Sequence, residues 1–293
     1  MSGVLWVDGS LRGANEPIVS AGNHGLTVGD GVFETLSVRQ GQPFALTRHL
    51  IRLQYSLDRM GMRAIDMGQV REGVRQVMAA NPADVVRVRI TVVSGPGPMG
   101  SARGPGIPNI IVWGGPGTVP GSCRATRVPW KRNERSAIVG VKSTSYAENV
   151  VMLHYADGKG ANEALMSNTQ GDLCEGTGSN IFIEHQGEIV TPPLSSGCLA
   201  GITRGLALEC GSAAGLPVRV AAPGELPMSV LDEVMHGGAF ASVSSSTRGI
   251  QPIVWLDGVD VAQGPLLKKL SALYESRADM DLDPSPTRAK DVV

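Results

Sequence analysis

The feature that most constrains the fold is the stretch from Val139 to Phe182, which holds a lysine, a later carboxylate and a turn rich in Gly, Ser and Asn. Lys142 follows a largely β-branched run at residues 138–141 and precedes the hydroxyl-bearing residues 143–145. We therefore expect a strand that ends at Lys142 and a helix that starts soon after it. Ends of strands are where α/β proteins gather their chemistry.

Lys142 has the surroundings of a reactive amine. An amine that is partly removed from water loses its proton more easily and can form a Schiff base with an aldehyde. The alternative is a surface cation with a solvated tip, which is the usual state of a lysine. The chain has only six lysines, and Lys142 is the one with apolar strand residues beside it. The pattern therefore favours the chemical role.

Length and composition indicate a globular chain with two domains. A chain of 293 residues with 42% hydrophobic residues can bury one large core or two moderate ones. The Gly/Pro-rich segment 114–121 is the best candidate for a linker, so we place a small N-terminal domain at 1–118 and a larger domain at 119–278. Residues 279–293 combine charge and proline without an apolar pattern, which predicts a disordered tail.

Charge and apolar patterning exclude several classes of partner. A net charge of −1 gives no electrostatic reason to expect nucleic acid or an anionic membrane. No apolar run approaches the roughly 18 to 20 residues of a membrane-spanning helix, and residues 1–27 lack the pattern of a signal peptide. We expect a cytoplasmic protein. The cysteines show no metal-binding spacing and no histidines cluster, so we expect no metal site and reduced thiols.

Local patterns predict the other elements. Strands alternate polar and apolar residues, and helices repeat apolar residues every three to four positions. Thr47 is expected to cap a helix that carries Leu50, Leu53 and Leu57. Strands are predicted at 5–11 (as a pair), 32–39, 43–46, 85–93, 107–113, 123–128, 163–166, 172–174, 180–183, 189–191 and, around a polar turn, at 239–254. Helices are predicted from 47 to about 60 and at 68–78, 146–157, 202–213, 225–236 and 264–275.

The segment Gly95–Gly100 matches the G-x-G-x-x-G pattern after a strand, which would suggest a dinucleotide site. Pro96 and Pro98 remove backbone N–H donors, and no helical pattern follows to supply a dipole for a pyrophosphate. We therefore interpret the segment as a loop beside the active site.

Six motifs in order resemble the class IV aminotransferase family, the pyridoxal-phosphate enzymes of fold type IV. The resemblance covers most of the chain, from about residue 4 to about residue 275. The resemblance implies an α/β fold of the α+β type, with a small N-terminal α/β domain and a larger, barrel-like C-terminal α/β domain. The motifs are Gly29-Asp-Gly-Val-Phe-Glu-Thr35, His49-Leu-Ile-Arg-Leu53, Lys142-Ser-Thr-Ser-Tyr-Ala-Glu-Asn149, Asn162-Glu-Ala-Leu165, Glu175-Gly-Thr-Gly-Ser-Asn-Ile-Phe182 and Leu199-Ala-Gly-Ile-Thr-Arg204.

The resemblance implies a cofactor, pyridoxal 5′-phosphate, and a role for each matching residue. Lys142 would be the catalytic lysine and the covalent anchor of the cofactor, and Glu175 would pair with the pyridinium nitrogen. Arg52 would bind the phosphate, because a planar and permanently charged fork suits that group. The remaining residues expected at the cofactor are Ser179, Asn180, the backbone N–H groups of Ile202 and Thr203, and the hydroxyls of Ser245 and Ser246.

The reaction is harder to predict than the cofactor. The family's D-amino-acid enzymes use a tyrosine where this chain has Phe33, and an Arg-x-His pair that is missing after Ser94. Phenylalanine at this position resembles the 4-amino-4-deoxychorismate lyases, which release pyruvate and 4-aminobenzoate, a folate precursor. The run after Lys142 departs from the Lys-His-Leu-Asn form of some lyases. Phe33, Thr35 and Arg89 are the candidate substrate residues, although Arg89 could equally be a residue of the strand surface.

Two other functions remain open at this point. One is an aminotransferase that acts on a D-amino acid, a branched-chain amino acid or another amine. The other is a protein that binds the cofactor without turnover, which Lys142 and Glu175 disfavour. The substrate is expected to be a small-molecule amine in each case. By analogy with the family we also expect a homodimer.

Overall fold

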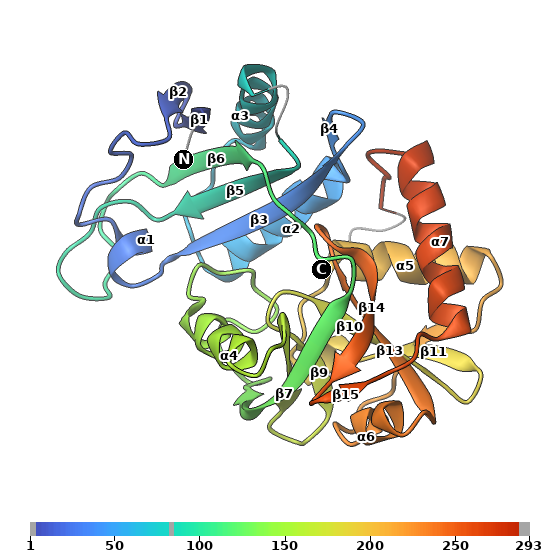
Figure 1. Cartoon of the computed structure of the whole chain (residues 1–293). Coiled ribbons are helices and arrows are strands. Elements are labelled where there is room, and N and C mark those ends of the chain that lie inside the picture. The colour runs from blue at the N-terminus through green and yellow to red at the C-terminus, as the bar shows by residue number, and fades with distance from the viewer. Residues whose placement is uncertain (1–3, 82–84, 287–293) are drawn as a thin grey trace.

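The computed structural model describes residues 4–81 and 85–286, which form two sheets with helices packed around them (Figure 1). The first six strands make one sheet, and all later strands make the second sheet. The segment 116–122 connects the two sheets. The mixed α/β class is therefore as predicted, and we keep the division between residues 118 and 119 as a proposal.

The first sheet is antiparallel with strand order β2-β1-β6-β5-β3-β4. Helices α2 and α3 cover one of its faces, and apolar side chains from both helices and from β3, β5 and β6 fill the space between. The opposite face looks toward the second sheet. The elements are β1 (Val4–Val7), β2 (Ser10–Gly13), α1 (His24–Thr27), β3 (Gly31–Arg39), β4 (Gln42–Pro43), α2 (Leu46–Arg59), α3 (Met67–Ala80), β5 (Arg87–Val93) and β6 (Asn109–Gly115).

The second sheet has the order β12-β11-β10-β13-β14-β7-β8-β9, with β15 paired to β14. Strand β9 also lies against β10, so the sheet curls into a partly closed barrel with an apolar interior. Helices α5 and α7 pack on its outside. The elements are β7 (Cys123–Arg132), α4 (Ala147–Asp157), β8 (Glu163–Asn168), β9 (Leu173–Gly176), β10 (Asn180–His185), β11 (Glu188–Thr191), a 3₁₀ turn (Leu194–Ser196), α5 (Ile202–Ala213), β12 (Val218–Val220), α6 (Val230–Met235), β13 (Ala239–Ser245), β14 (Gly249–Leu256), β15 (Val259–Asp260) and α7 (Pro265–Met280).

Most local predictions are confirmed, including the hairpins β1–β2, β3–β4, β8–β9, β10–β11 and β13–β14. The strand expected before Lys142 is wrong. Residues 133–141 instead form turns in which Val139 N donates to Ser136 O and Val141 N to Ile138 O. Gly140 adopts a φ of 75°, which interrupts the β-branched run. The helix after Lys142 is confirmed as α4.

Two helix boundaries also differ from the prediction. Helix α2 begins at Leu46 after Ala45, so Thr47 lies inside the first turn and does not cap the helix. Helix α6 spans only Val230–Met235, because the expected start at Glu225 lies in a turn where its carboxylate binds Arg219.

The prediction of a disordered tail from residue 279 is wrong for the described part of it. Helix α7 continues to Met280, and residues 281–285 contact α2 through hydrogen bonds. Residues 287–293 lie outside the described part of the chain. The polar composition was misleading because these residues bind through backbone and carboxylate oxygens rather than through apolar burial.

Candidate active site

A cleft of about 990 Å³ lies between the two sheets. Its walls come from β3 and β5, from the segment that leads into α4, from the turn between β9 and β10, from the start of α5 and from the turn between β13 and β14. All of the predicted site residues line it: Phe33, Thr35, Arg52, Arg89, Lys142, Glu175, Ser179, Asn180, Ile202, Thr203, Ser245 and Ser246.

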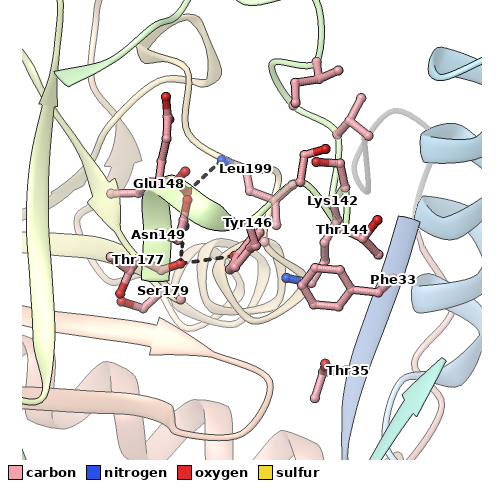
Figure 2. Close-up of a pocket in the computed structure, with 18 of the residues that line it drawn as sticks. Phe33, Thr35, Lys142, Thr144, Tyr146, Glu148, Asn149, Thr177, Ser179 and Leu199 are labelled. Atoms are coloured by element: carbon pink, nitrogen blue, oxygen red, sulfur yellow. Dashed lines mark hydrogen bonds between the residues drawn. The ribbon is translucent and has the colours of Figure 1, made fainter. Parts of the chain in front are cut away.

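Lys142 is held in the cleft by its backbone. Its carbonyl accepts from Phe33 N at 2.9 Å, and Ser143 forms an isolated bridge to Val32. The amine lies 4.2 Å from the centroid of the Phe33 ring and 5.8 Å from that of Tyr146 (Figure 2). Burial, reinforced by the positive charge of Arg52, lowers the pKa of Lys142 to about 8. At pH 7 about a tenth of the amine is therefore uncharged and able to attack a carbonyl group, a far larger fraction than for an ordinary lysine.

Arg52 belongs to a buried ion group on the wall formed by α2. Its Nε and Nη2 donate to the two carboxylate oxygens of Glu34 at 2.8 and 2.7 Å, and Nη1 donates to Ala200 O. Glu34 also contacts His49 Nδ1 at 2.6 Å. Burial alone would raise the pKa of Glu34, but Arg52 and His49 hold it at about 2. Three of the five N–H groups of Arg52 are thus used, and two remain for a ligand in the cleft.

The start of α5 offers backbone donors to the same region of the cleft. The helix follows Gly201, which provides no side chain to cap it, and Ile202 and Thr203 line the cleft. The first N–H groups of an uncapped helix have no partner within the helix and carry a partial positive charge. A side chain at position 201 would collide with Asn180 Oδ1, so glycine permits the close approach of β10. Arg52 and the start of α5 thus present hydrogen-bond donors of the kind that suit a phosphate.

Ser246 lies in the turn between β13 and β14, on the same side of the cleft as α2. Its hydroxyl is 3.3 Å from His49 Nε2. Ser245 lies beside Thr247 in that turn, with 3.5 Å between their hydroxyl oxygens. The predicted phosphate residues are therefore brought together from three parts of the chain that are distant in the sequence: α2, the start of α5 and the turn between β13 and β14.

Glu175 lies at the end of β9 on another wall of the cleft. One of its oxygens accepts from Leu199 N at 2.9 Å, and the other lies 3.4 Å from Arg132 Nη2. Burial raises the pKa of Glu175, while Arg132 and the Leu199 N–H oppose that rise. A carboxylate with a raised affinity for protons is suited to pair with a protonated ring nitrogen.

A second buried carboxylate, Glu163, fixes the turn that follows Glu175. It accepts from the backbone N–H and hydroxyl of Thr177 and from the hydroxyl of Ser179. Tyr146 and Asn149 then donate to Thr177 O, which ties α4 to this turn (Figure 2). The Ser179 hydroxyl is thus donated to Glu163, although the residue lines the cleft.

The sheet face opposite α2 and α3 forms the floor of the cleft and carries an unusual row of polar side chains. Thr35 on β3 is opposite Arg89 on β5, and Ser37 is opposite Arg87. The Arg89 guanidinium carbon lies 3.8 Å from the centroid of the Phe33 ring. Among the residues that the structure describes, the only hydrogen bond of the Arg89 side chain is to Thr91. Arg87 Nε and Ser37 Oγ are buried without a hydrogen-bond partner. Within the described residues neither arginine pairs with a carboxylate, so this floor is suited to an anion.

Sequence reasoning missed several residues that build the site. Glu34, His49, Tyr146 and Asn149 lie inside the quoted motifs, so their proximity to predicted residues was a usable signal. The sequence places Arg87 on the same strand face as Arg89, two residues away, and this shared face was the signal that could have included Arg87 in the site. Arg132 contacts Glu175 across a separation in sequence that no local pattern reveals.

The chemistry of these donors fits pyridoxal phosphate. The cleft combines a partly deprotonated lysine, a buried carboxylate, an arginine with free N–H groups and an open helix start, which correspond to the aldehyde, ring nitrogen and phosphate of that cofactor. In the described ranges, no three His, Cys, Asp or Glu side chains are placed to hold a metal ion.

Comparisons with known proteins agree with this fit. A relative from Methanocaldococcus jannaschii, named a putative branched-chain-amino-acid aminotransferase, is 28% identical and covers 92% of this chain and 95% of its own. The 4-amino-4-deoxychorismate lyase structure from Pseudomonas aeruginosa is 29% identical with a TM-score of 0.79, covering 95% of this chain and 99% of the other. A hypothetical aminotransferase from Mycobacterium tuberculosis in a PLP-bound form is 25% identical with a TM-score of 0.79, covering 93% and 98%.

The fold is thus that of the fold type IV pyridoxal-phosphate enzymes, as the sequence motifs implied. The model of the family described as amino-transferase class IV matches residues 31–255, which include the floor of the cleft, Lys142, Glu175 and the turn between β13 and β14. The chain therefore belongs to the class IV aminotransferases, a family of pyridoxal-phosphate enzymes.

Proposed function

We propose that this enzyme is a lyase that converts 4-amino-4-deoxychorismate into 4-aminobenzoate and pyruvate. The observation that carries the proposal is the position of the Lys142 amine on the Phe33 ring, beside the unpaired Arg89. The substrate carries one carboxylate on its ring and one on its enolpyruvyl group. A basic amine next to a floor with two unpaired arginines, Arg87 and Arg89, suits such a dianion.

The residues would divide the work as follows. Arg52, the start of α5 and Ser246 bind the cofactor phosphate, and Glu175 holds the ring nitrogen. When bound, pyridoxal phosphate supplies an electron sink for a carbanion beside the substrate amine. Lys142 would hold the cofactor aldehyde, and its amine would also be the group that moves protons. Phe33, which has no hydroxyl, offers an apolar surface to the substrate ring and leaves the carboxylates to Thr35 and Arg89.

The lyase step needs one base that removes the proton from the substrate carbon that bears the amine. Lys142 takes that proton, the electron pair forms the new ring double bond, and the carbon–oxygen bond to the enolpyruvyl group breaks. The released enolate takes a proton on its methylene carbon and becomes pyruvate. The ring gains aromaticity, and no amino acceptor is consumed.

The test of the reaction is pyruvate release in the absence of any 2-oxo acid. We expect stoichiometric pyruvate and 4-aminobenzoate from aminodeoxychorismate, and activity that required an added 2-oxo acid would contradict the proposal. The anchor is tested separately by borohydride reduction of the holoenzyme and peptide mapping. The label should appear on Lys142, and a label on any other lysine would refute this assignment.

The second candidate is an aminotransferase, which the likeness to the M. jannaschii relative favours. The donor would be a D-amino acid, a branched-chain amino acid or another amine, and the unpaired arginines favour an acceptor with two carboxylates. Single-turnover absorbance with each donor separates the candidates. An aminotransferase converts its cofactor to the pyridoxamine form with one of them, whereas the lyase does not.

We further propose a homodimer in the cytoplasm. Helix α4 exposes Val150 and Val151, with 63% and 54% of their surface accessible, and Leu153 and Trp130 lie half-exposed near them. Apolar side chains gathered in this way are typical of a surface covered by another chain. All four cysteines are free, which supports a reducing compartment. No helix of the described ranges is long and apolar enough to span a membrane. Light scattering should give a molar mass twice that of one chain, and Val151→Glu should shift the measured mass toward that of a single chain.

A further inference from the structure

A short segment after α7, residues 281–285, lies against the start of α2, and we name it the C-terminal strap. Leu282 O accepts from Ala45 N at 2.7 Å. The carboxylate of Asp283 accepts from Thr47 N at 2.7 Å and from the Thr47 hydroxyl at 2.6 Å. The strap therefore satisfies backbone donors at the first turn of a helix that is far from it in the sequence.

Helix α2 has no cap of its own. Ala45, at its N-cap position, has a left-handed φ of 55° and no side chain that could accept a hydrogen bond. A helix start without acceptors leaves its first N–H groups unsatisfied, and a nearby carboxylate is favourable there. Asp283 supplies both the acceptor and the negative charge that an Asp at the N-cap would normally provide.

Arg48 joins the strap to a second helix. Its side chain is almost fully buried, with 1% of the residue exposed. Nε donates to Pro284 O and Nη2 to Ser285 O, at 2.8 and 2.9 Å. The same guanidinium makes two bonds of 2.7 and 2.8 Å to the carboxylate of Glu209 on α5. One arginine thus links the strap, α2 and α5.

These two helices carry the proposed phosphate site. Arg52 lies one turn after Arg48 on α2, and α5 provides the N–H groups of Ile202 and Thr203. The spacing between Arg52 and the start of α5 determines whether one phosphate can contact both. Because binding groups must be held within about half an ångström of their productive position, the link between the helices matters for affinity.

We propose that the C-terminal strap, acting through Asp283 and Arg48, positions the two helices that bind the cofactor phosphate. The proposal rests on the assignment of Arg52 and the start of α5 to that phosphate. Neither Asp283 nor Arg48 lines the cleft, so they are positioning residues rather than catalytic ones. Their effect should be specific to ligands that carry the phosphate.

The test compares pyridoxal phosphate with pyridoxal, which has the same aldehyde and ring but no phosphate. Dissociation constants are measured by absorbance titration of the apoenzyme. The variants are Asp283→Asn, Arg48→Met, Arg48→Lys and a chain that ends at Met280. The controls are a chain that ends at Pro286, which keeps the strap, and Asp260→Asn, which makes the same charge change on exposed β15.

We expect Asp283→Asn and the chain ending at Met280 to weaken pyridoxal phosphate binding about tenfold, equivalent to about 1.4 kcal/mol, with pyridoxal affinity unchanged. Arg48→Met should do the same, and Arg48→Lys should restore only part of the affinity, because a lysine cannot form the paired bonds to Glu209. Both controls should match the unaltered enzyme.

Two results would overturn the inference while leaving the phosphate site intact. One is unchanged affinity of the strap variants for pyridoxal phosphate, and the other is an equal loss for pyridoxal, which would indicate a general effect on stability. An unaltered enzyme that binds both ligands equally would instead refute the phosphate site, and the inference with it. If the chain ending at Met280 does not fold, Asp283→Asn in the full-length chain gives the answer.

Discussion

At the residue scale, the site is dominated by buried charged side chains, most of which lie beside a side chain of opposite charge. Glu34 is fully buried between Arg52 and His49, and its charge offsets that of the arginine before any ligand binds. This arrangement keeps Arg52 fixed with part of its hydrogen-bonding capacity unused. Within residues 4–81 and 85–286, no carboxylate forms an ion pair with Lys142, and burial together with the neighbouring Arg52 lowers the pKa of its amine.

The buried Glu34 carboxylate should make the free energy of unfolding depend on pH in the acid range. Its pKa falls from an ordinary 4.5 to about 2 in the folded protein. A lowered carboxyl pKa contributes stability above the ordinary value, and that contribution is lost as the pH falls from 4.5 toward 2. We expect Glu34→Gln to cost about 3 kcal/mol at pH 7 and to flatten this part of the acid limb in urea unfolding. An acid limb with unchanged slope would contradict it.

Lys142 should react with pyridoxal phosphate at a lower pH than an ordinary lysine. Only the uncharged amine attacks the aldehyde, so the rate of attachment to the apoenzyme should rise with pH and reach half its maximum near pH 8. Stopped-flow absorbance gives this profile. Lys159, an exposed lysine in the same chain, provides the comparison through its rate of acylation. A midpoint near pH 10.5 for Lys142 would show that burial does not act as argued.

At the scale of elements, the two faces of β3 and β5 have different tasks. Val32, Leu36, Val88 and Ile90 are fully buried against the helices. The side chains on the opposite face of these strands, which include Thr35, Arg87 and Arg89, line the cleft. Because side chains alternate along a strand, one stretch of sequence supplies both a core layer and a binding surface.

Arg87 should determine preference for a substrate with a second carboxylate. We expect Arg87→Met to raise KM about tenfold for dicarboxylate substrates, because an anion is then left without a buried partner, and to leave monocarboxylates unaffected. Steady-state kinetics with both classes measures the effect. Arg12→Met, on exposed β2, is the matched control. Equal changes for the two classes would exclude Arg87 from the substrate site.

Helices and strands could be predicted from local sequence patterns, whereas contacts between residues far apart in the sequence could not. Period-two and helical repeats located most strands and helices, and motif residues such as Arg52, Lys142 and Glu175 do line one cleft. The pattern failed at residues 138–141, where a glycine and turn bonds outweigh β-branched side chains. It also could not pair Arg48 with Glu209 or Thr47 with Asp283, because the partner of a charged side chain depends on the tertiary fold.

At the scale of the whole molecule, the cleft is built by both sheets. Arg52 and Phe33 come from the first sheet and its helices, whereas Lys142, Glu175 and α5 follow the linker. A ligand that contacts all of these groups holds the two halves of the chain together.

Cofactor binding should therefore stabilise the entire fold. At a concentration about 100 times its dissociation constant, a ligand that binds only the folded state adds about 2.7 kcal/mol to the free energy of unfolding. For a chain of this size we expect pyridoxal phosphate to raise the Tm by roughly 5 to 10 °C, in a single transition monitored by calorimetry. Lys142→Ala should show a smaller rise. Two transitions, with only one shifted by the cofactor, would refute a site shared by both halves.

The parallel pairing of β7 with β14 has a consequence for biosynthesis. Cys123 in β7 is in register with Ile253 in β14. The first strand of the second sheet therefore cannot form this pairing until β14, near the end of the chain, has been synthesised. A nascent chain that has not yet released residues 249–256 from the ribosome exposes an unpaired β7 edge, which can associate with other chains. We expect productive folding of this half to be post-translational and slow, and to depend on chaperones that shield that edge.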